Sequence, residues 1–266
     1  MSAATQQVIA PAAAASLNLF GIEFCGLTFD QAVAFFHDRA CAGEGLVAFT
    51  ANVDHIVRRG KDPEFARLYQ AANVVFADGT PVVWSAKLLR RPVHRVPGID
   101  LLYACLRLAG ENGHRCFFLG ARPDTLSKAI AIAEKTFPGL RIAGSHHGYF
   151  QDPAPVLSAI AQATPHFIFV GMGSPRQERW IAENSAKIGS AIILPVGGSF
   201  EVLAGEKSRA PKFIQQVGME WVWRMLQDPQ RLWKRYLVED LPFLGMLLRE
   251  MIRSVRSMGP AQDRRA

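Results

Sequence analysis

Five short, uninterrupted apolar runs constrain the fold of this chain more than any other feature of its sequence. Each run is rich in Val, Ile, Leu, Ala and Phe. None shows the alternation of polar and apolar residues that is typical of a strand with one face exposed to solvent. The runs are Leu46–Thr50, Val74–Ala77, Cys116–Leu119, Phe167–Val170 and Ala191–Val196. Such runs are typical of strands that are buried on both faces of a parallel sheet.

The segments between these runs have the periodicity of helices. Helices are expected over residues 30–40, 62–72, 80–90, 99–112, 124–136, 153–163 and 174–187. Alternation of strand and helix predicts an α/β fold in which a Rossmann-like, layered parallel sheet carries helices on both faces.

The pattern changes after about residue 205, where strands end while helical periodicity continues and Trp, Arg and Lys accumulate. Pro211, Pro229 and Pro242 divide this part into about three short helices. The formal net charge is +7, yet residues 204–266 hold 12 Lys and Arg against 7 Asp and Glu, so most of the excess lies there. We therefore expect a flexible N-terminal tail (1–17), an α/β core (18–204) and a basic amphipathic helical appendage (205–266).

Composition excludes several classes of protein. With 49% hydrophobic and 20% charged residues, the chain is globular rather than disordered. Its four cysteines stand far apart in the sequence, which predicts reduced thiols in a cytoplasmic protein rather than a disulfide framework. The N-terminus lacks the positive charge of a secretory signal, and no apolar run is long enough for a transmembrane helix.

Polar residues follow two of the expected strands, at the edge where open α/β sheets bind ligands, and Arg95 precedes the turn before the helix expected at 99–112. Thr50 and Asn52 could hold a sugar or phosphate, or could cap the next helix. Asp78 is a candidate general base, or a cap for the helix near Pro81. Arg95 is a candidate clamp for a phosphate or carboxylate, or a solvated charge.

Two glycine-rich turns follow the last two expected strands. Gly171 and Gly173 precede the run PRQE, and Gly197 and Gly198 follow the strand at 191–196. Such turns can present backbone N–H groups to a phosphate, although neither matches a standard nucleotide-binding fingerprint. The pair His146-His147 lacks a third ligand, so no metal is expected there.

Eight segments, taken together and in this order, carry a resemblance to a known family. They are TANVDHIV (50–57), FADGTPVVW (76–84), RVPGIDL (95–101), FFLGARPD (117–124), GYF (148–150), GMGSPRQERWI (171–181), PVGGSFEVLAGEKSRAP (195–211) and GMEWVWRMLQDPQRLWKRY (218–236). Over residues 20–250 the chain resembles the WecG/TagA/CpsF family of bacterial glycosyltransferases.

The resemblance implies inverting transfer of a hexose-type sugar from a UDP-sugar to an undecaprenyl-diphosphate-linked sugar during cell-surface polysaccharide synthesis. It implies no metal and no other cofactor. Asp78 would be the catalytic base, and Thr50 and Asn52 would line the sugar pocket. Arg95 would contact the substrate, and Gln177 would face the reaction centre.

The resemblance also assigns the glycines and the cations of the appendage. Gly171, Gly173, Gly197 and Gly198 would let the nucleotide approach the backbone. The diphosphate would be held by Arg224, Arg231, and either Lys234 or Arg235, whose register is ambiguous. The chain departs from its relatives at Ala121-Arg122, where they often carry a second glycine and a smaller residue.

The basic appendage is rich in Trp and Leu, and no nucleic-acid-binding motif is present. Amphipathic spacing of apolar and cationic residues favours an anionic membrane surface, so we expect a peripheral protein on the inner face of the bacterial plasma membrane. A homo-oligomer is possible. The donor could carry N-acetylmannosamine, its uronic acid, or glucose. The alternatives are a sugar-nucleotide-modifying enzyme and a non-catalytic nucleotide- or lipid-binding protein on the same core.

Overall fold

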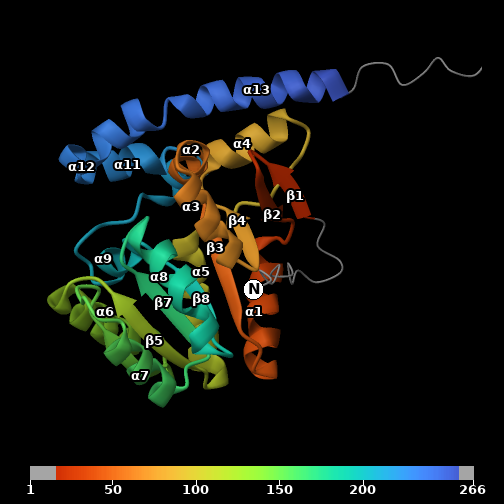
Figure 1. Ribbon diagram of the computed structural model, residues 1–266. Helices are drawn as coiled ribbons and strands as arrows, with labels where there is room; N and C mark the ends of the chain where they lie inside the picture. The colour runs from red at the N-terminus through yellow and green to blue at the C-terminus, as the bar shows by residue number, and fades with distance from the viewer. Residues whose placement is uncertain (1–15, 258–266) are drawn as a thin grey trace, which may run out of the picture.

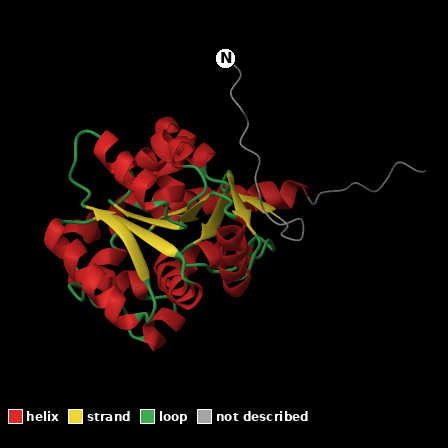
Figure 2. Ribbon diagram, turned by 90° about the horizontal axis from the view of Figure 1, so that it is seen from below, coloured by secondary structure: helices red, strands yellow, loops and turns green. Residues whose placement is uncertain are grey.

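A six-stranded parallel sheet forms the centre of the protein in the computed structural model. The structure describes residues 16–257, except for the side chains of Arg231 and of residues 254–257. The strand order is β4-β3-β8-β7-β5-β6, and helices cover both faces (Figures 1 and 2). The strands are β3 (Leu46–Ala51), β4 (Val74–Ala77), β5 (Arg115–Gly120), β6 (Arg141–His146), β7 (Phe167–Gly171) and β8 (Ile192–Pro195). The predicted α/β class with a layered, Rossmann-like sheet is confirmed.

Helices connect these strands. They are α1 (Phe29–Ala42), α2 (Val53–Lys61), α3 (Pro63–Leu68), α4 (Thr80–Leu88), α5 (Gly98–Asn112), α6 (Pro123–Thr136), α7 (Ala154–Ala163), α8 (Arg176–Ile188) and α9 (Ser199–Leu203). All but α2 and α9 lie in ranges expected from the periodicity. The expected helix at 62–72 is α3 followed by a 3-10 turn, Tyr69–Ala71.

Two apolar clusters, one on each face of the sheet, explain why the central strands are apolar without interruption. Phe118 and Phe169 point into one cluster, where Phe118 also stacks on Phe200 with ring centroids 5.1 Å apart. Phe117 and Ile168, the alternate residues of the same strands, point into the other. Side chains alternate between the faces of a strand, so both alternating sets must be apolar here.

Three strands were not predicted from the sequence. The edge strand β6 has half-exposed and exposed residues in alternation and a polar sequence, RIAGSH, so it has no uninterrupted apolar run. The antiparallel hairpin of β1 (Ser16–Leu19) and β2 (Ile22–Cys25) lies outside the main sheet. Ser16 and Leu17, expected in the N-terminal tail, belong to this hairpin, and the rest of that tail lies outside the described residues.

After α9 the described chain contains helices and no strand. These are α10 (Lys212–Gln216), α11 (Glu220–Gln227), α12 (Pro229–Lys234), the π-helix Arg235–Glu239 and α13 (Pro242–Ser257). Pro211 precedes α10, whereas Pro229 and Pro242 are the first residues of their helices, positions at which proline fits without breaking a hydrogen bond. In Figure 1 the blue helices α11, α12 and α13 lie along one end of the molecule.

Apolar contacts attach α13 to the core. Phe243 is buried, and its ring centroid lies 5.1 Å from that of Phe20 in the turn between β1 and β2. At Gly60 on α2, an added Cβ would lie 3.3 Å from Met246 Cε, so the absence of a side chain lets α13 approach closely. The hairpin and α2 together therefore form the surface against which α13 packs.

A second attachment joins α2 to the π-helix through charged groups. Asp54 on α2 is buried and forms ion pairs with Arg58 (3.5 Å) and Arg235 (3.1 Å). Burial raises the pKa of Asp240 to about 6, helped by the nearby charge of Asp54 and opposed by Arg235. Because Asp240 Oδ1 is also buried without a hydrogen-bond partner, its ionised form is poorly accommodated.

Replacing Asp240 with Asn removes this charge. The carboxyl of an unfolded chain ionises near pH 4, whereas the folded protein holds its proton up to a pH of about 6. Ionisation therefore destabilises the folded protein as the pH rises through that window, and fully above it. At about pH 7.5 we expect Asp240→Asn to raise the midpoint temperature of unfolding by a few degrees, on the order of 1 kcal/mol after solvent screening.

The same measurement near pH 4 should show little gain, because both proteins are then uncharged at this position. Asp38→Asn, a change on an exposed residue of α1, is the control and should show no pH-dependent gain. A stability difference for Asp240→Asn that is equal at both pH values would contradict the assignment.

Candidate active site

A cavity of about 880 Å³ lies between the carboxyl ends of the strands and the helices that follow α9. Its walls come from the loops after β3, β4, β5, β7 and β8 on one side and from α11, α12, the π-helix and α13 on the other. The residues of the expected site that line it are Thr50, Asn52, Asp78, Arg95, Gly171, Gly173, Gln177, Gly197, Gly198, Arg224 and Arg235. The fold thus places predicted site residues from distant segments of the sequence around one cavity.

Asp78 lies at the end of β4, where the chain leaves the sheet. Its Oδ2 accepts a hydrogen bond from the Gly98 N–H at the start of α5 (3.3 Å). The alternative that Asp78 caps α4 is wrong, because α4 begins after Gly79 without a side-chain cap. Burial raises the pKa of Asp78, although the charge of Arg224 and the Gly98 hydrogen bond act to lower it. Asp78 is therefore a carboxylate with increased affinity for a proton.

Thr50 and Asn52 lie beside Asp78 at the end of β3. A Cβ placed on Gly98 would lie 3.1 Å from Thr50 Oγ1, so the first turn of α5 closely approaches this hydroxyl. Asn52 caps α2, since its side chain accepts from the His55 N–H (3.2 Å). The alternative of an Asn cap is therefore confirmed, and the same residue also lines the cavity.

Glu220 joins the two sides of the cavity, and the sequence analysis did not single it out. Its carboxylate pairs through Oε2 with Arg95 of the core (2.9 Å) and through Oε1 with Arg224 on α11 (2.8 Å). Burial raises the pKa of Glu220, but the charges of Arg224, Arg95 and Arg209 outweigh it and leave the pKa lowered. The four-residue spacing of Glu220 and Arg224 is the one signal in the sequence that could have indicated their pairing.

Gln177 connects the loops after β7 and β8. Its Oε1 accepts from the Gly197 N–H (3.0 Å), and its Nε2 donates to Glu178 Oε1 (2.8 Å). The residue is buried, and both ends of its amide are engaged. This is the geometry of a side chain that positions the glycine turn at the wall of the cavity.

The four glycines of the expected site differ in the space around them and in their backbone conformation. At Gly171 an added Cβ would lie 2.5 Å from the ring of Phe200, so packing alone excludes a side chain. Gly173 and Gly197 have φ values of +76° and +53°, and an added Cβ would meet nothing within 4 Å. At Gly198 the nearest atom would be Glu201 Oε2 at 3.5 Å. Gly173 and Gly197 are therefore the positions where a ligand could approach bare backbone.

The expected cations of the appendage lie in different surroundings. Arg224 and Arg235 line the cavity, whereas Lys234 is exposed, lies outside its lining and pairs with Glu239 at 3.9 Å. The geometry thus favours Arg235 over Lys234 for contact with a ligand. The side chain of Arg231 lies outside the described residues.

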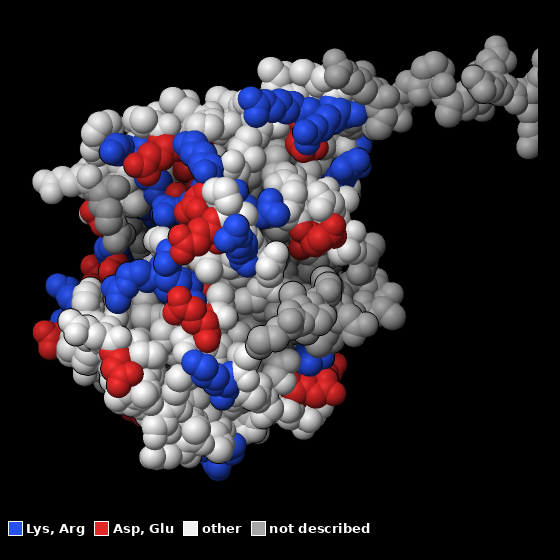
Figure 3. Space-filling model, viewed as in Figure 1, with Lys and Arg blue, Asp and Glu red and all other residues white. Residues whose placement is uncertain are grey.

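Charges of both signs lie close together on this side of the molecule. Figure 3 shows Lys and Arg side chains next to Asp and Glu rather than a uniform basic surface. Arg122, in the loop where the chain departs from the family pattern, is exposed and lies 3.7 Å from Glu206. The face seen in Figure 3 therefore lacks a broad positive field.

Known proteins resemble this chain over nearly all of the described residues. The model of the glycosyl transferase WecG/TagA/CpsF family matches residues 17–257. Two N-acetylglucosaminyldiphosphoundecaprenol N-acetyl-beta-D-mannosaminyltransferases of Staphylococcus aureus, from strains MW2 and NCTC 8325 / PS 47, are each 34% identical over 227 residues. Each match covers 83% of this chain and 87% of the relative.

The family match spans the six-stranded sheet, the loops at its carboxyl edge and the helices that close the cavity. The resemblance expected from eight short segments is confirmed, as is the expectation that the protein is an enzyme. This chain belongs to the WecG/TagA/CpsF family and is a glycosyltransferase.

Proposed function

We propose that this glycosyltransferase moves an N-acetylmannosamine-type sugar from a UDP-sugar to a sugar carried on a polyprenyl diphosphate, with inversion at the anomeric carbon. The observation that carries this proposal is Asp78, a half-buried carboxylate with a raised pKa at the edge of the cavity. The names of the Staphylococcus aureus relatives support N-acetylmannosamine over its uronic acid or glucose as the transferred sugar.

Asp78 accepts the proton of the acceptor hydroxyl in this proposal. As the proton leaves, the hydroxyl oxygen forms a bond to the anomeric carbon, and the bond from that carbon to the donor phosphate breaks. Because the attacking oxygen and the leaving phosphate lie on opposite faces of the sugar, the configuration inverts. The raised pKa favours this role, since a carboxylate of ordinary acidity accepts a proton less readily.

The leaving diphosphate gathers negative charge during the reaction. Arg95 and Arg224 already meet at Glu220, so two guanidinium groups are held at the cavity before any substrate arrives. Preorganised positive charge stabilises a developing anion without the cost of reorganising the site. These arginines can supply the electrostatic stabilisation that a metal ion supplies in other transferases, which supports a metal-independent reaction.

The remaining residues divide the cavity into two regions. Thr50 and Asn52 lie beside Asp78 and line the region for the sugar. Gly173 and Gly197 leave bare backbone for the nucleotide, and Gln177 holds the second of these turns in place. In this proposal the donor lies across the carboxyl edge of the sheet, where open α/β folds bind nucleotides.

Asp78→Asn separates catalysis from binding, because the amide keeps the size of the side chain and loses the base. We expect the rate of sugar transfer to fall by about 10²- to 10⁴-fold, the usual contribution of a general base. Binding of UDP, measured by calorimetry, should change by less than about threefold. Transfer is measured with a purified polyprenyl-diphosphate-linked acceptor.

Asp240→Asn is the matched control, since Asp240 is a second carboxylate of the same cavity with a raised pKa. It should retain transfer within about tenfold. Full transfer by Asp78→Asn, or a collapse confined to Asp240→Asn, would show that the base is misassigned. Tight UDP binding with no transfer by the unsubstituted protein would instead favour a non-catalytic binding protein.

The outer face of α13 supports a place for this enzyme on an anionic membrane. Phe243, Met246 and Leu247 turn towards the core, whereas Leu248 (58% exposed) faces outward and Leu244 (63% exposed) is largely exposed at the edge of the cavity. Further apolar residues of the appendage are also exposed: Leu226, Trp233, Leu237, Val238, Leu241, Met251 and Ile252. Exposed apolar surface, where it is extensive, often marks a site of contact with a membrane or a protein.

Positive charges accompany these apolar residues. Lys234 at the end of α12 and Arg249 and Arg253 on α13 are exposed, and Figure 3 shows Lys and Arg side chains along the edge formed by α13. None of the described helices has the length and hydropathy needed to cross a bilayer. We therefore propose that the appendage lies on the cytoplasmic face of the membrane, where a lipid-linked acceptor would be found.

The double substitution Leu244→Gln and Leu248→Gln tests this surface. Burial of one leucine in an apolar medium stabilises by roughly 1.5–3 kcal/mol, so the pair should weaken binding to phosphatidylglycerol vesicles by at least about tenfold. Vesicle co-sedimentation provides the measurement.

Ile132→Gln is the control, because Ile132 is an exposed apolar residue on α6 of the core (38% exposed). It should leave vesicle binding unchanged. Equal sedimentation of the double variant and the unsubstituted protein would rule out membrane contact through this face of α13.

A further inference from the structure

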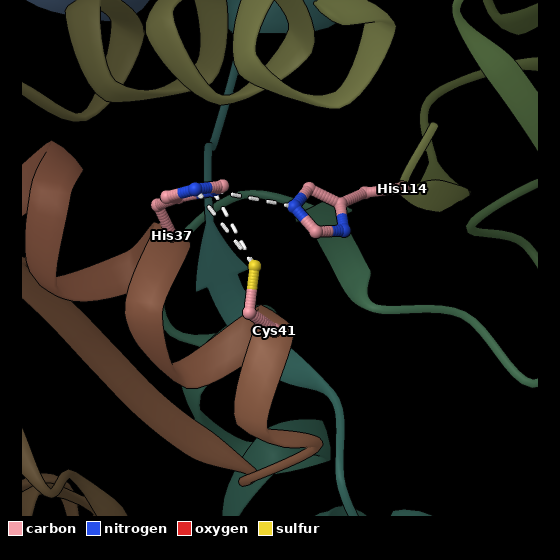
Figure 4. Close-up of side chains that lie close together, drawn as sticks. All are labelled: His37, Cys41 and His114. Carbon is pink, nitrogen blue, oxygen red and sulfur yellow. Dashed lines mark hydrogen bonds between the residues drawn. The ribbon is translucent and has the colours of Figure 1, made fainter. Parts of the chain in front are cut away.

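Three side chains of metal-ligating type converge at the opposite end of the sheet from the cavity. His37 and Cys41 lie one turn apart on α1, and His114 lies just before β5 (Figure 4). Their ligand atoms are all within 4.8 Å of one another, the single group of this kind among residues 16–257. Sequence spacing could not reveal it, because His114 is 77 residues away from His37.

The distances between these atoms match those of ligands around one tetrahedral ion. Cys41 Sγ lies 3.8 Å from His37 Nδ1, and His114 Nε2 lies 3.4 Å from the same nitrogen. Zinc bonds of about 2.3 Å to sulfur and about 2.0–2.1 Å to nitrogen at tetrahedral angles separate the ligand atoms by roughly 3.6 Å and 3.3 Å. These two separations are thus within a few tenths of an ångström of those expected around zinc, and the third pair of ligand atoms lies within 4.8 Å.

His114 is the buried member of the group, with 6% of its surface exposed. Its Nε2 faces His37, as the dashed line in Figure 4 shows. The ring is therefore enclosed by the core and directed at the other two side chains.

The two residues of α1 are accessible enough to complete the site. Sγ of Cys41 is equally far, 3.8 Å, from both ring nitrogens of His37, so the ring must turn to point one nitrogen at a shared ion. His37 is half-buried and Cys41 exposed, which leaves room for this rotation and for solvent in a fourth position.

We propose that His37, Cys41 and His114 form a site for one zinc ion, or another borderline-soft divalent transition metal, with water as the fourth ligand. The donor set of one thiolate and two imidazoles selects such ions over magnesium and calcium, which prefer oxygen. Since the ligands come from α1 and from the turn between α5 and β5, the ion would fasten two segments that are distant in sequence. The site is separate from the sugar-transfer cavity.

Zinc binding to the reduced, chelator-treated, tag-free full chain tests the proposal directly. Equilibrium dialysis with metal analysis should find about one zinc ion per chain. Cobalt(II) in its place should give the near-ultraviolet absorption of a cobalt–thiolate bond. Bound zinc should also raise the midpoint temperature of unfolding, because the ion binds the folded form.

Cys41→Ser should weaken zinc binding by about 100-fold and abolish the cobalt–thiolate absorption, since it removes one of three protein ligands. His37→Gln should weaken zinc binding similarly, and both positions are accessible enough to tolerate substitution. His94→Gln, at an exposed histidine outside the group, should bind zinc as the unsubstituted protein does. Absence of stoichiometric zinc binding, or equal binding by Cys41→Ser, would overturn the proposal.

Discussion

The shared ion pair at Glu220 is the interaction on which the candidate site depends. One carboxylate holds Arg95 of the core and Arg224 of α11, and it thereby fixes how the helices after α9 meet the edge of the sheet. Two guanidinium groups this close would otherwise repel each other. A carboxylate between them offsets that repulsion and leaves donors at the wall of the cavity, beside the carboxylate of Asp78.

This interaction changes what the basic character of the chain means. From the sequence, the excess of positive charge in residues 204–266 was expected to meet an anionic membrane surface and to hold a diphosphate. In the structure several of these cations are paired: Lys207 contacts Glu201 and Asp228, and Arg235 contacts Asp54. The appendage therefore combines three properties, namely arginines held at the cavity, exposed cations along α13, and an apolar outer face.

Much of the fold was predictable because buried strands and amphipathic helices leave strong patterns in a sequence. The central strands β7 and β8 are apolar on both faces, so their runs were evident. The edge strand β6 is half-solvated and left no such pattern. In the site, Asp78 and the glycine turns followed from their places after strands, whereas Glu220 and the group at His37, Cys41 and His114 depend on tertiary contacts. Local spacing cannot report a contact between His37 and His114, or between Arg95 and Glu220.

We propose that Asp78 and the arginines at Glu220 perform an inverting sugar transfer to a lipid-linked acceptor. To test this, the purified protein is incubated with UDP-N-acetylmannosamine and a synthetic polyprenyl-diphosphate-linked N-acetylglucosamine, and the product is determined by mass spectrometry and NMR. We expect one added sugar whose anomeric configuration is opposite to that of the donor. A product with retained configuration, or no transfer from any UDP-sugar, would contradict it.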